Sequence, residues 1–362
     1  MILSLGKNPS PEAVEKISRR LSENGLASQV IVSGEATLVI ITSSAESVPG
    51  HLFSQMEGVE KVIKLTNRAP LAAEGGCTFL NIGTEAAGRG RLAIGSGKPP
   101  VVIAGPCSVE SREHILETAQ AVKLAGAHAL RGGAYKPRTN PYDFQGLGLD
   151  GLKFMAEAGA REKLPVISEV MTAEQVESAI PYVDVFQVGA RNMYNYDLLK
   201  ELGRQTKPVL LKRAMSATID ELIQSAEYIL ASGNLQVILC ERGIRTFETR
   251  VRNTLDISAV AVLKSLTGLP VVVDPSHACG KRDLVRALSR AAIACGADGL
   301  IIESHCQPEK SISDAAQAVS PALLKEIVAD TAVIAQALSM RSLDASEDKA
   351  CDEGPNLVSS RS

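Results

Sequence analysis

Residue types that bind metal ions follow three of the apolar, β-branched runs of this chain. Cys107, His277 and Glu303 each stand within a few residues of the end of such a run, and Asp314 lies in the loop after the last one. One thiolate, one imidazole and two carboxylates form a mixed donor set, which suits a divalent transition ion better than magnesium or calcium. His305, two residues beyond Glu303, is a competing ligand. The alternative is structural, with Cys107 as a small buried apolar residue and His277 as a hydrogen-bonded core residue.

Basic residues follow the other runs in the same way. They are Arg131, Lys136, Arg191, Lys212 and Arg242. Five cations gathered at one place repel one another unless an anion joins them. Arginine offers a planar fork to phosphate and carboxylate oxygens, and lysine offers a point charge, so the pattern predicts small substrates with several negative charges. The chain has no Walker A motif and no G-x-G-x-x-G motif directly after a strand-like run, which argues against a nucleoside triphosphate or a dinucleotide.

Eight apolar runs that alternate with amphipathic helical stretches are expected to position these residues. The runs are 101–104, 129–130, 166–167, 185–188, 209–211, 237–239, 271–273 and 300–302. Strands that alternate with helices predict a parallel sheet, and eight repeats within residues 100–341 match the size of a (β/α)8 TIM barrel. A doubly wound sheet is the alternative, because the number of repeats alone does not close a barrel. In a barrel the first, seventh and eighth strands are neighbours, so the candidate metal ligands would share one wall at the carboxyl ends of the strands.

Residues 1–66 predict a separate small domain ahead of this barrel. The expected elements are a strand at 2–5, a helix at 10–24, strands at 29–33 and 37–42, a helix at 50–56 and a strand at 59–65. This βαββαβ order is that of a ferredoxin-like domain. Residues 67–99 are expected to form a linker with two short strands, at 77–82 and 90–94, over the barrel floor. Residues 342–362 are polar without an apolar period, which predicts a disordered tail.

The composition excludes several other classes of protein. The chain has 362 residues with 45% hydrophobic and 22% charged residues, which is typical of a globular enzyme. A net charge of −3, no Trp and 3% aromatic residues argue against binding to nucleic acid or to an anionic membrane surface. Seven scattered cysteines without a CxxC pair are typical of the reducing cytosol. No apolar run approaches a membrane span, and the first residues lack the apolar core of a signal peptide, so a cytoplasmic protein is expected.

Eight stretches across the expected barrel are long enough to compare with a known family. They are AGPCSVES (104–111), LRGGAYKPRTNPYDFQGLG (130–148), QVGARN (187–192), PVLLKR (208–213), ILCERGIRTFE (238–248), residues 249–260, VVVDPSH (271–277) and PEKSISD (308–314). In these stretches the chain resembles the 3-deoxy-D-arabino-heptulosonate-7-phosphate (DAHP) synthases, in particular the microbial subgroup with a ferredoxin-like domain ahead of the barrel. The resemblance of residues 1–66 is one of pattern and position only.

The resemblance implies an activity and a role for each candidate residue. The family condenses phosphoenolpyruvate with erythrose 4-phosphate and water, giving DAHP and phosphate in the first step of the shikimate pathway to aromatic amino acids. The implied ligands of a divalent transition metal (manganese, iron, cobalt or zinc) are Cys107, His277, Glu303 and Asp314. The implied phosphoenolpyruvate ligands are Arg131, Lys136, Arg191, Lys212 and Arg242. The resemblance also implies that Arg138 and Thr139 bind erythrose 4-phosphate and that Asp274 contacts a hydroxyl of this aldehyde. Lys136 is in addition a hypothetical proton donor to the aldehyde oxygen. The candidate catalytic residues are therefore Lys136 together with the implied metal ligands Cys107 and His277.

The resemblance leaves alternatives open. The nearest is the sister enzyme that makes 3-deoxy-D-manno-octulosonate 8-phosphate from arabinose 5-phosphate. The segment Lys136-Pro137-Arg138-Thr139 favours the four-carbon aldehyde, because the sister family usually has Ala-Asn-Arg after this lysine. A barrel without turnover that acts as a regulatory protein is the second alternative. The family usually forms homo-oligomers, often tetramers, and residues 1–66 would bind an aromatic amino-acid effector or mediate oligomerisation.

Six residues depart from the family pattern. They are Asn140, Ala214, Cys279, Ser304, Cys306 and Ala315. None of them removes a proposed ligand, but residues around a metal site tune its properties. The two additional cysteines suggest a disulfide with Cys107 that would release the metal, and ordinary drift among small residues is the alternative.

Overall fold

A closed barrel of eight parallel strands forms the body of the molecule. The computed structural model describes residues 2–5, 9–33, 36–41, 51–54, 56–63, 68–138 and 140–350. The barrel strands are β7 (Val101–Gly105), β8 (Ala129–Arg131), β9 (Val166–Glu169), β10 (Val185–Val188), β11 (Val209–Lys212), β12 (Val237–Glu241), β13 (Val271–Val273) and β14 (Gly299–Glu303). Strand β14 pairs with β7 and closes the ring, which confirms the predicted barrel and excludes the doubly wound sheet. Strands β13, β14 and β7 are neighbours, as the metal-site hypothesis requires.

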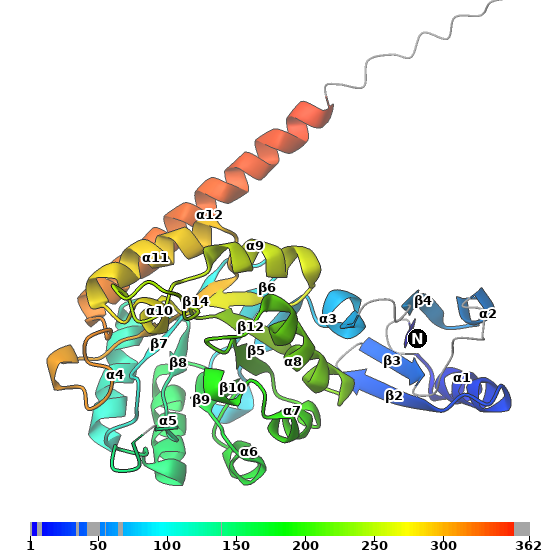
Figure 1. Ribbon diagram of the computed structural model, residues 1–362, viewed down its shortest axis with the longest axis horizontal. Helices are drawn as coiled ribbons and strands as arrows, with labels where there is room; N and C mark the ends of the chain where they lie inside the picture. The colour runs from blue at the N-terminus through cyan, green and yellow to red at the C-terminus, as the bar shows by residue number, and fades with distance from the viewer. Residues whose placement is uncertain are drawn as a thin grey trace, which may run out of the picture.

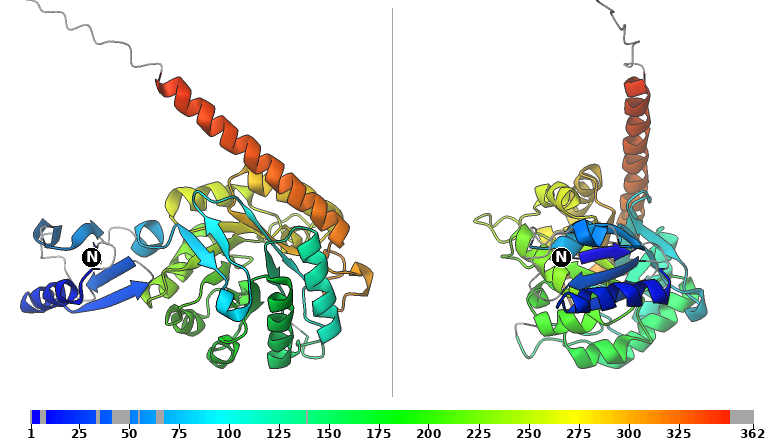
Figure 2. Two further views of the ribbon diagram at one scale, coloured as in Figure 1. Left: turned by 180° about the vertical axis from the view of Figure 1, so that it is seen from behind. Right: turned by 90° about the vertical axis from the view of Figure 1, so that its right-hand side faces the viewer.

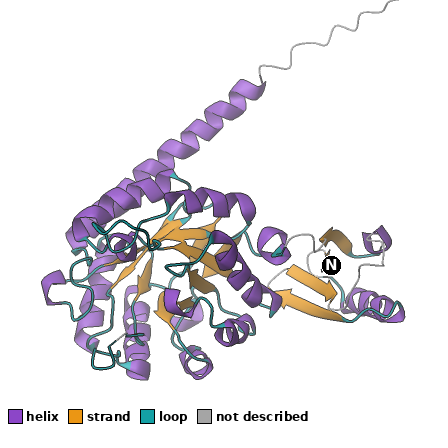
Figure 3. Ribbon diagram, viewed as in Figure 1, coloured by secondary structure: helices purple, strands orange, loops and turns teal. Residues whose placement is uncertain are grey.

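Helices surround the barrel on its outside (Figures 1 and 3). They are α4 (Arg112–Leu124), α5 (Gly148–Glu162), α6 (Ala173–Ala179), α7 (Tyr196–Gly203), α8 (Ile219–Ala231), α9 (Ile257–Leu266), α10 (Pro275–Cys279), α11 (Arg282–Ala294) and α12 (Pro321–Ala350). Side-chain caps define where several of them begin, because the first N–H groups of a helix have no partner within it. Ser111 accepts a hydrogen bond from His114 N at the start of α4, and Thr218 forms a capping box with Glu221 at the start of α8.

Two apolar layers explain why the strands are hydrophobic on both faces. Successive side chains of a strand point to opposite sides. On β7, Ile103 points into the barrel, where it packs with Ile238 and Ile301, while Val102 belongs to the layer under the helices. The hairpin of β5 (Phe79–Ile82) and β6 (Leu92–Gly95) lies against the barrel and adds apolar side chains to the inner cluster (Figure 2, left).

The N-terminal domain has the predicted order of elements. They are β1 (Ile2–Leu5), α1 (Pro11–Glu23), β2 (Ser28–Ser33), β3 (Ala36–Ile41), α2 (His51–Ser54) and β4 (Val59–Ile63). The strands pair antiparallel in the order β2-β3-β1-β4, and residues 34–35 of the predicted hairpin loop lie outside the described residues. The helix α3 (Pro70–Glu74) leads to the barrel, where the Glu227 carboxylate of α8 accepts hydrogen bonds from Leu71 N (3.0 Å) and Ala72 N (2.8 Å).

Residues 342–350, which are predicted to belong to a disordered tail, continue the last helix of the structure. Helix α12 continues to Ala350, and its outer end extends away from the barrel (Figures 1 and 2). Residues 342–350 include several good helix formers (Leu, Ala, Glu and Lys), which continue a helix even where no apolar face is needed. Residues 351–362 lie outside the described residues. Within the described part of the chain, no helix combines the length and apolar character that a membrane span requires.

Replacing Asp330 with asparagine is expected to destabilise the fold at neutral pH more than in acid. Asp330 on α12 accepts hydrogen bonds from Arg286 Nε (2.6 Å) and Arg290 Nε (2.8 Å) on α11. These bonds, chiefly the one from Arg286, lower the pKa of Asp330 to about 2. Because this pKa lies below that of the unfolded chain, the carboxylate stabilises the fold above about pH 4 and loses this effect as the pH falls toward 2. Urea unfolding should give a loss of about 1 kcal/mol at pH 7 and a smaller one at pH 3; equal losses would contradict the assignment.

Candidate active site at the carboxyl ends of the barrel strands

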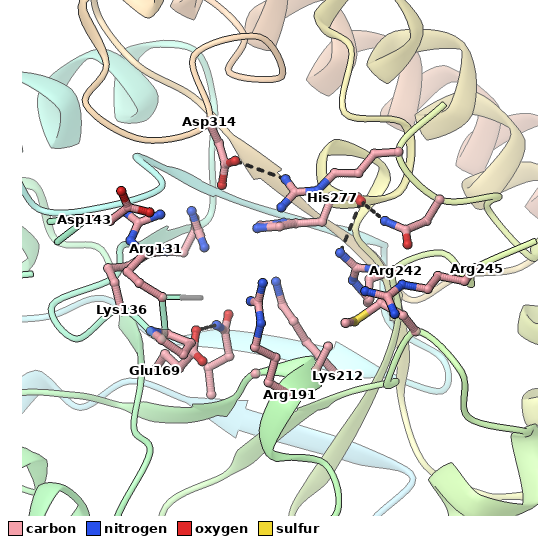
Figure 4. A pocket seen from close by; sticks show the side chains of 18 residues that line it. Arg131, Lys136, Asp143, Glu169, Arg191, Lys212, Arg242, Arg245, His277 and Asp314 are labelled. Atoms are coloured by element: carbon pink, nitrogen blue, oxygen red, sulfur yellow. Dashed lines mark hydrogen bonds and ion pairs between the residues drawn. The ribbon is translucent and has the colours of Figure 1, made fainter. Parts of the chain in front are cut away.

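A strongly basic pocket opens at the carboxyl ends of the barrel strands (Figure 4). Its volume is about 350 Å³, which is within the range of small-molecule sites. Its basic lining residues are Arg131, Lys136, Arg138, Arg191, Lys212, Arg242, Arg245 and Arg252. Only Asp143, Glu169 and Asp314 among the lining residues are acidic. This excess of positive charge fits an occupant with several negative charges.

The four candidate metal ligands lie together, with His277 and Asp314 in the pocket lining and Cys107 and Glu303 in contact with them. The ligand atoms of Cys107, Glu303 and Asp314 are all within 4.8 Å of one another. The Cys107 thiol donates to Asp314 Oδ2 (3.1 Å), and His277 Nε2 lies 3.2 Å from Glu303 Oε1. Cys107 follows β7, His277 is in α10 directly after β13, and Glu303 ends β14. These residues come together because β13, β14 and β7 are adjacent. The fold therefore places one sulfur, one nitrogen and two carboxylate donors next to one another.

Asp274 fixes the orientation of the His277 ring. It caps α10 by accepting from His277 N (2.9 Å), and its Oδ2 lies 2.6 Å from His277 Nδ1 and 2.6 Å from Lys212 Nζ. Burial would raise the pKa of Asp274, but the charges of His277 and Lys212 lower it well below its usual value. An ionised Asp274 accepts a hydrogen bond from the Nδ1–H group of the neutral His277 ring. The lone pair of Nε2 then faces Glu303, which is the usual arrangement around a metal-binding histidine.

Lys136 reaches the same wall from the loop after β8. Its Nζ donates to Cys107 O (2.9 Å) and lies 3.2 Å from Cys107 Sγ. Gly133 makes this approach possible, because a Cβ there would lie 2.5 Å from Lys136 Cδ and 2.7 Å from Cys107 O. Burial, followed by the charge of Glu303, raises the pKa of Cys107, so the thiol keeps its proton until a cation displaces it.

Asp314 is held in position by its neighbours. Its backbone is in the left-handed region (φ 54), which is uncommon for a residue other than glycine. Arg252 Nη1 donates to Asp314 Oδ1 (3.0 Å). Burial would raise the pKa of Asp314, but the charges of Arg252 and His277 lower it to about 2. The carboxylate is therefore ionised at neutral pH, as a metal ligand must be.

The remaining predicted cations lie around the pocket. Arg131, at the end of β8, donates to Pro106 O (2.7 Å) and lies 3.2 Å from Glu303 Oε1. Arg191 is in the short 3-10 helix η2 (Ala190–Asn192) after β10. Arg242, after β12, donates to His277 O (3.2 Å). All five predicted phosphoenolpyruvate ligands line one pocket, so the sequence pattern and the geometry agree on where an anion would bind.

The residues predicted for the aldehyde have different positions. Arg138 lines the pocket, where it donates to Phe144 O (2.9 Å) and to Ser313. Thr139 lies outside the described residues. Asp274 is not among the lining residues, because it is enclosed between Lys212 and His277. Its predicted contact with an aldehyde hydroxyl stays a prediction.

His305 belongs to a neighbouring cluster and not to the Cys107 wall. Its ring stacks on His114 with centroids 4.3 Å apart, and its Nε2 lies 3.6 Å from Glu110 Oε2. These three residues also resemble a metal-binding group. However, Gln307 N donates to His305 Nδ1 (2.9 Å), which leaves the proton of the neutral ring on Nε2, the atom that faces the cluster. The cluster instead anchors the loop after β14, since Glu110 Oε1 accepts from Ile312 N (2.8 Å).

Several lining residues were not among the predicted ones. Arg245 and Arg252 come from the long loop after β12. A loop has no regular periodicity from which the direction of its side chains could be predicted. Glu169 ends β9 and accepts from Gln187 Nε2 (3.2 Å), and its Oε1 has no hydrogen-bond partner among the described residues. Gly189 leaves space for this carboxylate, because a Cβ there would lie 2.0 Å from Glu169 Oε1. The position of Glu169 at the carboxyl end of a predicted strand could have identified it as a pocket residue from the sequence.

The polar side chains of the departures from the family pattern make hydrogen bonds to other residues than the proposed ligands. The Cys279 thiol donates to Pro275 O (3.0 Å), and the Cys306 thiol to Thr118 Oγ1 (3.7 Å). The six cysteines of the described part are all free, so no disulfide with Cys107 is formed. Ser304 donates to Val319 O (3.2 Å). Asn140 Oδ1 accepts from Tyr142 N (3.1 Å) and stabilises a local turn. Ala214 is buried.

Comparison with known proteins finds relatives that are named as aldolases of phosphorylated deoxy sugar acids. The model of the DAHP synthetase I family matches residues 72–337. The chain is 42% identical to phospho-2-dehydro-3-deoxyheptonate aldolase of Thermotoga maritima over 344 residues, which cover 94% of this chain and 99% of that protein. The crystal structure of the Thermotoga enzyme matches with a TM-score of 0.71 over 93% of this chain and 97% of that one. A 2-dehydro-3-deoxyphosphooctonate aldolase of Geobacter sulfurreducens is 32% identical, and the match covers 68% of this chain and 97% of that protein.

Proposed function

The chain belongs to the DAHP synthetase I family, and we propose that it condenses phosphoenolpyruvate with erythrose 4-phosphate and water at the basic pocket of its barrel. The products are DAHP and phosphate, in the first step of the shikimate pathway to aromatic amino acids. One observation carries the assignment of the site: His277 and Asp314 line the same pocket as a wall of cations, and the Cys107 sulfur and the Glu303 carboxylate contact them there. A polarising ion and two anionic substrates can therefore meet there.

The proposed metal ligands are Cys107, His277, Glu303 and Asp314. Their donor types fit manganese, iron, cobalt or zinc, and the Asp274 contact to His277 Nδ1 supports this use of the histidine. A divalent ion held there would supply the Lewis acidity that makes an aldehyde carbon electrophilic. The ion also replaces the thiol proton of Cys107, so its binding is expected to be weaker at lower pH.

The cations on the other sides of the pocket are proposed to hold both substrates. Arg131, Arg191 and Arg242 carry forks that suit the carboxylate and phosphate of phosphoenolpyruvate, and Lys136 and Lys212 add point charges. Arg138, next to Ser313, is the proposed ligand of the erythrose 4-phosphate phosphate group. Holding two anions at bonding distance against their mutual repulsion is a contribution of position and electrostatics.

The proposed reaction requires a proton donor near the aldehyde oxygen. Carbon 3 of phosphoenolpyruvate forms the new bond to the aldehyde carbon, water adds to carbon 2, and the bond between carbon 2 and the phosphate oxygen breaks to leave the ketone. The aldehyde oxygen gains a proton in this sequence. Lys136 Nζ, which is 3.2 Å from Cys107 Sγ at the proposed metal wall, is suitably placed to donate it.

The choice of aldehyde separates this proposal from the sister activity. The relative named as a heptonate aldolase matches 94% of the chain at 42% identity, and the one named as an octonate aldolase matches 68% at 32% identity. Phosphate release from phosphoenolpyruvate should be measured with erythrose 4-phosphate and with arabinose 5-phosphate in parallel. We expect kcat/KM to be about 10²-fold higher with erythrose 4-phosphate. A preference for arabinose 5-phosphate would assign the sister activity.

We further propose that the N-terminal domain binds an aromatic amino-acid effector, with oligomerisation as the alternative role. A pocket between Gln29–Val32 of β2 and the barrel loops near Arg204 and Gly233 supports contact between the two parts. Deletion of residues 1–66 is expected to leave phosphate release intact and to abolish inhibition by tyrosine or phenylalanine. A solved truncated form of the Thermotoga enzyme matches 75% of this chain, so a folded barrel is expected. Unchanged inhibition would contradict the regulatory role, and gel filtration would test oligomerisation.

A cytoplasmic location is also proposed. The free and scattered cysteines support a reducing compartment. Fractionation of cells that express the chain tests this proposal.

A further inference from the structure

Each carboxylate at the proposed metal wall has one oxygen held from behind. Glu303 Oε2 accepts from Gln317 Nε2 (2.5 Å), while Glu303 Oε1 lies 3.2 Å from His277 Nε2. Asp314 Oδ1 accepts from Arg252 Nη1 (3.0 Å), while Asp314 Oδ2 lies 3.1 Å from Cys107 Sγ. In both carboxylates one oxygen lies next to another proposed ligand, and the opposite oxygen is occupied by an amide or a guanidinium. Glu303 Oε1 also accepts from Arg131 Nη1 (3.2 Å).

Arg252 and Gln317 are themselves joined, so the two carboxylates belong to one chain of hydrogen bonds. Arg252 Nη1 donates to Gln317 Oε1 (3.0 Å), in addition to its bond to Asp314. This contact fixes the direction of the amide, because an arginine only donates and an ionised carboxylate only accepts. Gln317 must therefore present its oxygen to Arg252 and its nitrogen to Glu303. The order Asp314–Arg252–Gln317–Glu303 leaves no alternative hydrogen-bond pattern.

The backbone supports the same interpretation. Asp314 has a left-handed φ of 54, a conformation that persists in a residue with a Cβ only where its surroundings hold it. Its carbonyl accepts from Gln317 N (3.1 Å), so the turn that begins at Asp314 delivers Gln317 to Glu303. Gln317 is 2% exposed and does not line the pocket, whereas Arg252 does. Gln317 is thus too deep to contact a substrate, and its side-chain bonds join it to the Glu303 carboxylate and to Arg252.

We propose that Arg252 and Gln317 are positioning residues that align the Asp314 and Glu303 carboxylates and thereby set the affinity of the site for its divalent cation. This inference rests on the proposed metal site. Contacts behind metal ligands typically change metal affinity by about 10–100-fold when they are removed. Both residues act through one chain of hydrogen bonds. The Kd of the double variant should therefore be close to that of the weaker-binding single variant, and the two fold-changes should not multiply.

Cobalt(II) titration of the metal-free full-length protein tests this proposal. Competition with a chelator gives the Kd, and a thiolate-to-cobalt charge-transfer band reports binding at Cys107 separately from any other site. The variants are Arg252→Met, Gln317→Met and the double variant, with Arg252→Lys as the conservative change. Arg245→Met is the matched control, since Arg245 lines the same pocket and its side chain makes no contact with Glu303 or Asp314 in the described part of the chain.

We expect one equivalent of cobalt with a charge-transfer band in the unsubstituted protein, and a Kd about 10–100-fold higher in Arg252→Met and Gln317→Met. Arg252→Lys should recover part of the affinity, and Arg245→Met should bind as the unsubstituted protein does. Thermal unfolding of the metal-free forms should be nearly unchanged, which separates positioning from a general structural role. Equal affinities in all variants, or an equal loss in Arg245→Met, would overturn this inference alone. No cobalt band in the unsubstituted protein would overturn the proposed metal site as well.

Discussion

Replacing Cys107 with alanine is expected to lower phosphate release by about 10³-fold or more. The bound divalent metal should fall from about one equivalent per chain to a small fraction of that value. Cys107 supplies the only sulfur of the proposed donor set, and its ligand atom lies within 4.8 Å of those of Glu303 and Asp314. Removal of this sulfur leaves two carboxylates and an imidazole, which hold a transition ion less tightly than the complete set does. Metal analysis of the purified protein and a phosphate-release assay measure both effects.

Cys279→Ala is the matched control for this experiment. Its thiol is on the same side of the barrel, in α10, but it donates to the carbonyls of Pro275 and Lys281. Metal content and turnover should stay close to those of the unsubstituted protein. If Cys107→Ala kept its metal and its activity, the proposed donor set would be wrong. If both alanine variants lost them, the effect would come from the fold and not from a ligand.

Lys136→Met is expected to lower turnover by about 10²–10³-fold while the metal content stays near one equivalent. The Lys136 ammonium donates to Cys107 O (2.9 Å) and is buried, and a buried charge interacts more strongly with an anion than one in water. Methionine keeps the length of the side chain and removes the charge and the proton. Turnover should therefore suffer more than metal binding. Steady-state kinetics and metal analysis of the same preparation give the two values.

Lys153→Met serves as the control, because Lys153 pairs with Asp150 on the surface of α5, away from the pocket. Its turnover should be unchanged. An equal loss of turnover and metal in Lys136→Met would contradict the role as a proton donor. Such a result would make Lys136 a residue that supports the Cys107 ligand.

The sequence predicted the barrel because its strands are buried on both faces. An apolar run with helical stretches on either side is typical of a strand in a parallel sheet, and eight of them match the size of a barrel. The pairing of β14 with β7, which closes the ring, is seen only in the structure. The position of Cys107, His277 and Glu303 after neighbouring strands was enough to place them together. The chain reversal that returns Asp314 to the same wall depends on its left-handed backbone, and nothing in the sequence around it requires that conformation. Its role came from the family resemblance.

The neighbouring residues Lys212 and Arg213 show that the periodicity of a strand can distinguish a side chain in the pocket from one that points away from it. Lys212 ends β11 and faces the pocket, while Arg213 points away and binds Glu241 and Asp256. Successive residues of a strand face opposite sides, so this difference follows from the sequence. Arg245 and Arg252 are in a loop without such a period, and their contribution to the pocket requires the structure. The same holds for α12, where the apolar pattern ends before the helix does.

We propose that one pocket brings a divalent metal and two anionic substrates together for a DAHP-forming condensation. The most direct test is phosphate release from phosphoenolpyruvate and erythrose 4-phosphate by the purified protein before chelation, after chelation and after manganese is added back. We predict that activity is lost on chelation and restored by manganese, and that arabinose 5-phosphate is a poor replacement throughout. Activity that is unaffected by complete removal of the metal would contradict the account.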